Sequence, residues 1–258
     1  MTRSGSISFD HAAGFYDKTR GLSPDAAERI TDLLAHELQG RERVLEIGVG
    51  TGRIALPLAE RGISLVGVDL ARNMLSRLVK NAGGRSPFPL VQADATRLPL
   101  RDAAFDAALV SWVLHLIEDW KGALAELVRV VTPGGVVVID VGGKEGSITS
   151  KLTWRFRDIA GVTDWPRGVD DHRRVDEALT LLGARPRTLD PVTETTQLTL
   201  ERHIELLERG IYSVTWGLDE AARVAAAQEL RGWATHEYGS LSEPRQTEAT
   251  HVWRAYDL

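Results

Sequence analysis

The first half of the chain alternates short apolar segments with amphipathic ones, and this alternation restricts the fold more than any other feature of the sequence. The segment 105–113 is almost continuously apolar, which is typical of a strand buried on both faces of a sheet. Strands that alternate with helices predict a parallel sheet covered by helices on both faces. The predicted strands are 44–47, 63–68, 89–93, 105–113 and 136–141, and the predicted helices include 52–61, 71–80 and 120–131. We therefore predict an α/β fold with a doubly wound, mostly parallel sheet.

The pattern changes at about residue 142. A Thr-rich strand at 187–199 and a closing strand at 247–256 would complete the sheet. The segments 142–170 and 200–240 would leave the sheet at the carboxyl ends of its strands, where ligands bind in such folds. We expect these two insertions to form a helical lid. The predicted parts are thus an N-terminal helical segment, 1–40, a binding core, 41–141, and a C-terminal half with the lid, 142–258.

Composition excludes several classes of function. The formal net charge is −5 and the pI is near 5.8, so the chain lacks the basic surface expected of a nucleic-acid-binding protein. It has no cysteine, which rules out disulfides, thiolate metal sites and a cysteine nucleophile. Its histidines show no metal-ligand spacing, and we expect no metal cofactor.

The sequence also lacks a membrane-spanning pattern. Its longest apolar stretch, 107–117, is interrupted by Ser111 and His115, and the first ten residues contain no apolar signal core. We therefore expect a cytoplasmic protein with no membrane partner.

A glycine-rich loop, Glu46-Ile-Gly48-Val-Gly50-Thr-Gly52, lies between a predicted strand and a predicted helix. A dinucleotide-binding fingerprint would need a small residue at position 53, where this chain has Arg53. Asp69 and Asp94 end the next two predicted strands. A carboxylate in the position of Asp69 can accept hydrogen bonds from both hydroxyls of a ribose. The loop and the two acidic strand ends together predict a site for a ribose-containing ligand.

These segments resemble a known family. The run 44–52 resembles motif I of the class I S-adenosylmethionine-dependent methyltransferases, 66–70 with 73–75 is similar to motif II, and 92–95 with 98–100 is similar to motif III. The segments 105–115 and 129–135 are similar to later motifs of the ubiquinone/menaquinone-biosynthesis-like branch, and 14–20 resembles the N-terminal segment of its small-molecule members.

The resemblance implies a Rossmann-like sheet of seven strands and S-adenosylmethionine as cofactor, with S-adenosylhomocysteine as its product. In this family Asp69 would bind the ribose, Asp94 with Ala95 would bind the adenine amine, and Tyr16 with Arg20 would cover the carboxylate. The residues implied around the cofactor are Tyr16, Arg20, Glu46, Gly48, Val49, Gly50, Thr51, Gly52, Asp69, Leu70, Met74, Asp94, Ala95, Ser111 and Trp112.

The residues that would serve the methyl acceptor are less marked. His115 follows the fourth predicted strand and is a candidate general base, although a buried histidine that only fills space is an equal reading. Four tryptophans fall in the predicted lid, where they would either line an acceptor pocket or pack the lid against the sheet: Trp154, Trp165, Trp216 and Trp233.

The predicted activity is methyl transfer by in-line displacement to an O, N or C atom of a small molecule. Two alternatives stay open at this point, a protein that binds the cofactor without transferring a methyl group and an RNA or protein methyltransferase. The sequence leaves the choice between monomer and homodimer open as well.

Overall fold

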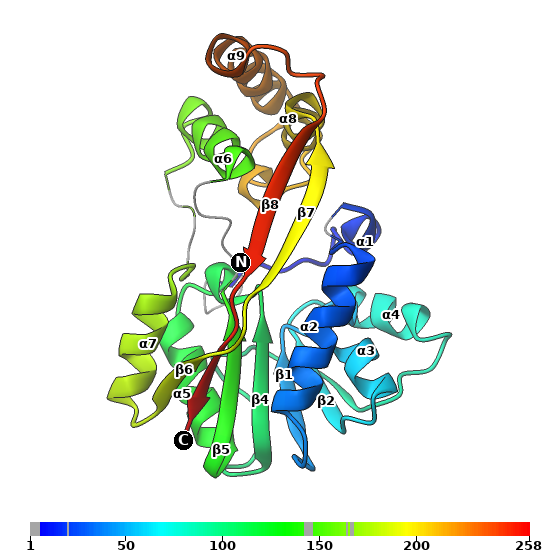
Figure 1. Cartoon of the computed structure of the whole chain (residues 1–258), viewed down its shortest axis with the longest axis vertical. Coiled ribbons are helices and arrows are strands. Elements are labelled where there is room, and N and C mark those ends of the chain that lie inside the picture. Colours follow the sequence, from blue (N-terminus) through cyan, green and yellow to red (C-terminus); the bar gives the residue numbers. More distant parts are fainter. Residues whose placement is uncertain (1–5, 20, 142–146, 164, 166–167) are drawn as a thin grey trace. The chain divides into compact units, whose positions relative to one another are not determined.

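The computed structural model describes residues 6–19, 21–141, 147–163, 165 and 168–258 (Figure 1). Arg20, which the family resemblance predicts to lie at the cofactor, lies outside the described residues. The chain divides into two compact units. Unit 1 comprises Met1–Gly143, Arg167–Val192 and His251–Leu258, and unit 2 comprises Lys144–Pro166 and Thr193–Thr250.

Unit 1 contains a seven-stranded sheet with the strand order β3-β2-β1-β4-β5-β9-β6. Its strands are β1 (Val44–Ile47), β2 (Leu65–Asp69), β3 (Leu90–Gln92), β4 (Phe105–Ser111), β5 (Val131–Asp140), β6 (Arg185–Thr188) and β9 (Arg254–Asp257). The pairs among β1 to β5 are parallel, and β9 runs antiparallel to both β5 and β6. The predicted fold class, a mostly parallel Rossmann-like sheet of seven strands, is confirmed.

Helices cover both faces of this sheet (Figure 1). The helices of unit 1 are α1 (Tyr16–Thr19), α2 (Pro24–Glu37), α3 (Ala55–Glu60), α4 (Arg72–Asn81), α5 (Trp120–Val130) and α7 (His172–Leu181). Because side chains alternate along a strand, Val44 packs with α2, α3 and α4, whereas Leu45 packs with α5 and α7. Each face of the sheet therefore has its own buried hydrophobic cluster.

The starts of two helices follow from their capping residues. The hydroxyl of Ser23 accepts a hydrogen bond from the N–H of Ala26, and Pro24 opens α2. The carboxylate of Asp119 accepts from the N–H of Gly122 at the start of α5. These caps satisfy backbone donors that have no partner within the helix.

Two of the predicted strands were wrong, because each corresponds to two separate strands in the structure. The predicted strand 187–199 is β6, which ends at Thr188, and a separate strand β7 (Val192–Leu198). The predicted strand 247–256 is likewise β8 (Arg245–His251) followed by β9. Strands β7 and β8 pair with each other in a second, two-stranded sheet. Pro191 lies in the first break, and it lacks the N–H that a continuous ladder requires.

Strand β5 is longer than the predicted strand 136–141. It begins at Val131, directly after α5, and includes residues 132–135. Phe105 pairs with Val131 and Ala107 with Val136, so these residues form an irregularity within the strand pair. Gly134 allows this excursion because its φ is +78°.

Unit 2 has a core of its own. It contains α6 (Ile148–Ile159), α8 (Leu200–Glu208), a short 3-10 helix η2 (Ser213–Thr215) and α9 (Glu220–Tyr238), with the β7–β8 ribbon. Leu152, Phe156, Ile204 and Leu230 are buried together between its three α-helices. The predicted lid segments fall mostly within unit 2, and their action as a lid stays a prediction.

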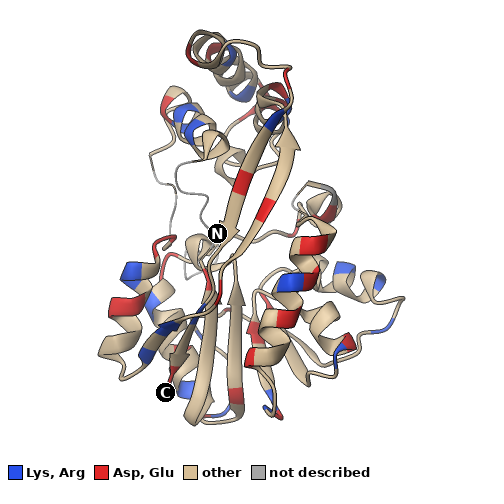
Figure 2. Ribbon diagram, in the orientation of Figure 1, with Lys and Arg blue, Asp and Glu red and all other residues tan. Residues whose placement is uncertain are grey.

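Figure 2 shows both positively and negatively charged side chains on α2 and on α7 of unit 1. Neither helix therefore carries a surface of one sign of charge. In the part of the chain that the structure describes, no helix combines the length and the apolar character needed to cross a membrane.

Candidate functional site

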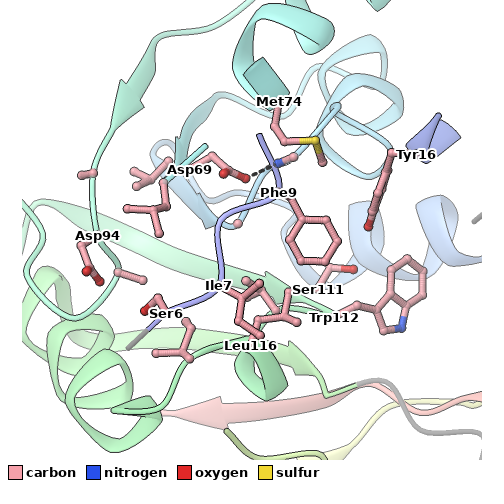
Figure 3. Close-up of a pocket in the computed structure, with 18 residues that line it drawn as sticks. Ser6, Ile7, Phe9, Tyr16, Asp69, Met74, Asp94, Ser111, Trp112 and Leu116 are labelled. Atoms are coloured by element: carbon pink, nitrogen blue, oxygen red, sulfur yellow. Dashed lines mark hydrogen bonds between the residues drawn. The ribbon is translucent and has the colours of Figure 1, made fainter. Parts of the chain in front are cut away.

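A pocket opens in unit 1 at the carboxyl ends of β1, β2, β3 and β4 (Figure 3). Its space, counting the part open to solvent, is about 660 Å³. The lining residues are Ser6, Ile7, Phe9, Tyr16, Gly48, Gly50, Val68, Asp69, Leu70, Met74, Ala93, Asp94, Ala95, Ser111, Trp112, Val113, Leu116 and Ile117. The pocket thus lies where parallel α/β sheets bind their ligands.

The glycine loop forms the floor of this pocket through Gly48 and Gly50. Both have positive φ, +67° and +55°, a conformation that side chains other than that of glycine rarely adopt. A Cβ atom at Gly48 would lie only 2.7 Å from Cγ2 of Val113. One at Gly52 would lie 2.7 Å from Cγ of Leu56. Close packing thus requires glycine at both ends of the loop.

Asp69, at the end of β2, is bound to the loop. Its Oδ2 accepts a hydrogen bond of 2.8 Å from the N–H of Gly50, and its Oδ1 accepts one of 2.8 Å from the N–H of Ala71. Burial raises the pKa of Asp69, although these two backbone hydrogen bonds oppose the rise. Each carboxylate oxygen has a second lone pair, so a fixed acceptor faces the pocket.

Asp94 lies at one end of the pocket, and Tyr16 and Trp112 lie at the other (Figure 3). The carboxylate of Asp94 is oriented by Thr96, whose N–H and hydroxyl both donate to Oδ1, at 3.0 and 2.8 Å. Apolar side chains line the space between Asp94 and the loop, among them Leu70 and Met74. A flat apolar group with polar edges fits this end of the pocket.

Glu46 lies beneath the loop on β1 and is only 2% exposed. Among the described residues its Oε2 finds no hydrogen-bond partner. Burial raises the pKa of Glu46 well above its usual value, the positive charge of Arg53 lowers it, and the negative charge of Asp69 raises it further. A buried carboxylate oxygen left without a partner is rare in folded proteins and needs an explanation.

The end of β4 supplies the far wall of the pocket. Ser111 pairs in register with Asp140 of β5, and its buried Oγ has no hydrogen-bond partner within the described part of the chain. Trp112 has a φ of +50°, and its N–H donates to the carbonyl of Asp140 at 3.0 Å. Its ring centroid lies 4.1 Å from the guanidinium carbon of Arg53 and 5.7 Å from the ring centroid of His251. Strained non-glycine residues of this kind cluster at functional sites.

The N-terminal segment, residues 6–19, forms the front of the pocket (Figure 3). The N–H of Ile7 donates to the carbonyl of Leu116 at 3.0 Å, which ties the segment to the chain after β4. Asp10 accepts a hydrogen bond of 2.8 Å from the N–H of Asn73, which ties it to α4. Sequence patterns alone did not point to Ser6, Ile7 and Phe9, because their place in the pocket depends on these tertiary contacts.

Asp17 fixes the same segment to the glycine loop. Its Oδ1 accepts a hydrogen bond of 2.6 Å from the hydroxyl of Thr51, and its Oδ2 accepts from Arg77 and Asn81, both at 3.1 Å. Burial raises the pKa of Asp17, but these hydrogen bonds and the charge of Arg77 outweigh it, so the pKa is lowered overall. The N-terminal segment and the loop are thus one hydrogen-bonded structure.

Most of the residues predicted around the cofactor line this one pocket: Tyr16, Gly48, Gly50, Asp69, Leu70, Met74, Asp94, Ala95, Ser111 and Trp112. Four others support it from behind without lining it: Glu46, Val49, Thr51 and Gly52. Their roles toward a cofactor stay predictions.

His115 lies in a short 3-10 helix, η1 (Leu114–Leu116), four residues beyond the end of β4. It is not one of the described residues that line the pocket, and its carbonyl accepts a hydrogen bond of 3.1 Å from the N–H of Gly168. The structure therefore adds no support to the prediction that His115 is a base.

The four tryptophans of the predicted acceptor pocket all belong to unit 2. Trp165 and Trp233 pack against its core, and the indole N–H of Trp216 donates to the carbonyl of Gly210 at 3.0 Å. Trp154 is 46% exposed. Three of them thus have packing or hydrogen-bonding roles within unit 2, and their contact with an acceptor stays a prediction.

The described residues contain no group of three or more His, Asp or Glu side chains placed to hold a metal ion.

Residues 45–139 match the sequence profile of a family described as "Methyltransferase domain". A protein of Streptomyces avermitilis described as demethylmenaquinone methyltransferase is 37% identical over 134 residues, which make up 51% of this chain and 57% of that protein. The chain thus spans little more than half the length of this relative.

Two solved structures show the same fold. A candidate methyltransferase from Bacillus halodurans is 15% identical with a TM-score of 0.62, and the match covers 89% of this chain and 98% of that one. The [4+2]-cyclase SpnF is 21% identical with a TM-score of 0.55, covering 92% of this chain and 84% of its own. At these identities the likeness concerns the fold alone, which hosts more than one kind of chemistry.

Proposed function

From the match of residues 45–139 to a methyltransferase domain family, we propose that the chain transfers a methyl group from S-adenosylmethionine to a small molecule. The observation that carries the proposal is the position of Asp69, which lines the pocket and whose carboxylate is held by two backbone N–H groups. It gives a ribose a fixed acceptor next to a glycine loop. The atom that receives the methyl group would be an O, N or C atom of the small molecule, and the sequence leaves the choice among the three open.

The pocket residues fit this cofactor along its length. Leu70 and Met74 would pack against the adenine, with Asp94 at its polar edge, and Asp69 would accept hydrogen bonds from the ribose hydroxyls. The hydroxyl of Ser111, which has no hydrogen-bond partner among the described residues, would suit the amino-acid end. When bound, S-adenosylmethionine supplies a methyl group that is already activated by its sulfonium.

The protein's own contribution would be alignment and exclusion of water. Phe9 is only 7% exposed, and the segment that carries it is anchored on both sides of the pocket, at Leu116 and at Asn73. With the reactants held in line, displacement at the methyl carbon needs no covalent enzyme intermediate. A base would be needed only for an acceptor that must lose a proton.

Unit 2 is our proposal for the part that selects the acceptor. The chain passes between the two units four times, and the first and last of these crossings lie just after β5 ends at Asp140 and just before β9 begins at Arg254. Both of these crossings occur at the edge of the sheet that carries the pocket, because β9 runs antiparallel to β5. Residues 200–240 should therefore exchange amide hydrogens more slowly once cofactor and acceptor are both bound. Protection confined to unit 1 would argue against this role.

Calorimetry tests whether the protein binds the proposed cofactor, and mass spectrometry tests whether a methyl group is transferred to a small molecule. S-adenosylmethionine and S-adenosylhomocysteine should each bind at one site per chain, and NAD should not bind comparably. Screening a library of small molecules with the cofactor present should then yield a product heavier by one methylene unit, together with S-adenosylhomocysteine. Tight binding of NAD alone would refute the cofactor assignment. Cofactor binding without any methylated product would favour a protein that does not transfer methyl groups.

A further inference from the structure

We propose that Arg53 binds the carboxylate at the amino-acid end of the ligand in this pocket. The inference rests on the proposed function, because it takes that ligand to be S-adenosylmethionine or its product. Arg53 is then a specificity residue that favours nucleosides carrying an amino-acid tail over nucleosides that lack one.

The position of Arg53 is the first support. Its guanidinium carbon lies 4.1 Å from the ring centroid of Trp112 and 5.6 Å from that of Tyr16. Both rings line the pocket at the end away from Asp94 (Figure 3). A guanidinium that stacks on an aromatic ring keeps its N–H groups in its own plane, where two of them can bind one carboxylate.

The charge distribution of the pocket points the same way. Among the described residues that line it, Asp69 and Asp94 are the charged ones, and none is Lys or Arg. A ligand carboxylate would therefore be repelled at the end formed by these two aspartates. Arg53, against Tyr16 and Trp112 at the opposite end, supplies the positive charge that such a group needs.

Glu46 provides an independent sign of a ligand. Its buried Oε2 has no partner among the described residues, and an unpaired carboxylate oxygen beside a pocket is suited to a cationic ligand group. The charge of Arg53 lowers the pKa of Glu46, so the two side chains lie within electrostatic reach of each other. An α-amino acid carries an ammonium and a carboxylate on one carbon, so its ammonium could meet Glu46 while its carboxylate meets Arg53.

The glycine spacing explains why an arginine can occupy position 53. In dinucleotide-binding proteins the third glycine of the fingerprint occupies this position, where it permits close packing of helix and strand. In this chain Gly52 takes that role, since an added Cβ would lie within 2.9 Å of both Leu56 and Leu78. Position 53 does not have to meet this requirement for a glycine, so it can carry a long side chain.

A binding cycle with three ligands tests the inference without relying on catalysis. The ligands are S-adenosylhomocysteine, its decarboxylated analogue, which keeps the amine, and 5′-methylthioadenosine, which lacks both groups. Calorimetry would compare the wild type with Arg53→Gln, Arg53→Lys and a control, Arg61→Gln, whose arginine pairs with Asp32 at the surface. Thermal unfolding of each variant would establish that it is folded.

The wild type should bind S-adenosylhomocysteine at least about tenfold more tightly than the decarboxylated analogue, the size expected for hydrogen bonds to a charged group. Arg53→Gln should remove this difference, Arg53→Lys should keep part of it, and Arg61→Gln should keep all of it. Because the missing carboxylate and the missing guanidinium would be the same interaction, their effects should not add.

Three results would overturn the inference. Arg53→Gln could weaken all three ligands equally, which would make Arg53 a structural support of Tyr16 and Trp112. A parallel Arg20→Gln variant could abolish the discrimination while Arg53→Gln keeps it, which would assign the carboxylate to Arg20. The wild type could also fail to distinguish the first two ligands. Failure of the wild type to bind any of the three would instead refute the proposed function, and this inference with it.

Discussion

The N–H of Gly50 donates a hydrogen bond of 2.8 Å to the carboxylate of Asp69, which joins the middle of the glycine loop to the end of β2. Two further loop N–H groups are also used within the protein, that of Val49 by Val68 and that of Gly52 by Val49. Loops that bind pyrophosphate instead present such N–H groups to the ligand. The hydrogen bonding of this loop therefore suits a ribose next to a carboxylate better than a dinucleotide.

Replacing Asp69 with Ala should weaken both the ligand and the loop. The change removes a charged acceptor for the ribose, worth about 1.5–3 kcal/mol, so affinity for S-adenosylhomocysteine should fall about tenfold or more. It also leaves two backbone N–H groups without their acceptor, so the melting temperature should fall. Calorimetry and thermal unfolding measure the two effects, with Asp32→Ala as a surface control. Wild-type affinity in Asp69→Ala would contradict the ribose assignment.

Gly48→Ala should be far more damaging than the same change at Gly62. Both glycines have positive φ, +67° and +83°, and each substitution carries the backbone cost of roughly 1 kcal/mol. Only at Gly48 does the new Cβ meet another side chain, at 2.7 Å from Val113, whereas nothing lies within 4 Å at Gly62. Chemical denaturation should give an additional loss of about 1–3 kcal/mol for Gly48→Ala. Equal losses would show that Val113 can move aside.

Asp17→Ala should release the N-terminal segment from the glycine loop. It removes the acceptor of three side-chain hydrogen bonds, from Thr51, Arg77 and Asn81. Amides of residues 7–17 should exchange faster, on the order of tenfold, and bound S-adenosylhomocysteine should dissociate faster. Hydrogen exchange and stopped-flow binding check this, with Asp25→Ala as control because Asp25 is an exposed partner of Arg29. Unchanged exchange would mean that Ile7 and Asp10 suffice to hold the segment.

The buried Glu46 should make stability fall with rising pH in the ligand-free protein. Burial raises the pKa of Glu46 well above its usual value of 4.5, so the folded chain retains a proton that the unfolded chain releases. Stability from this group is full below about pH 4.5 and is lost as the pH rises toward the folded-state pKa. The uncharged Glu46→Gln variant should therefore gain in melting temperature over the wild type as the pH rises above 4.5. A difference that stays constant with pH would contradict this.

The prediction that His115 is a base has a separate kinetic test. For an acceptor that must lose a proton, His115→Ala should lower kcat by about 10²–10⁴-fold and remove the acidic limb of the pH–rate profile. A rise in KM with that limb retained would show that His115 only positions the acceptor. If both parameters stay at wild-type values, His115 is a packing residue, in keeping with its absence from the described lining of the pocket.

The alternation of apolar and amphipathic segments was enough to predict the parallel sheet. The periodicity and length of each segment can be read from residues that are neighbours in the sequence. The glycine loop, Asp69 and Asp94 were equally visible, since each sits where a predicted strand ends and parallel strands end at one edge. The division of 187–199 and 247–256 into two strands each was not visible. Both halves of each segment have strand-like residues, and the partner strand decides which sheet each half joins.

Only the tertiary structure placed Phe9 in the wall of the pocket, held there by contacts of its segment with residues more than 60 positions away. The tertiary structure also brought Arg53 close to the rings of Tyr16 and Trp112. In the sequence, Arg53 was notable only as a departure from a glycine pattern. Local sequence sets strands, helices and turns through short-range backbone preferences. Which side chains meet across a pocket depends on long-range packing, and no spacing along the chain encodes it directly.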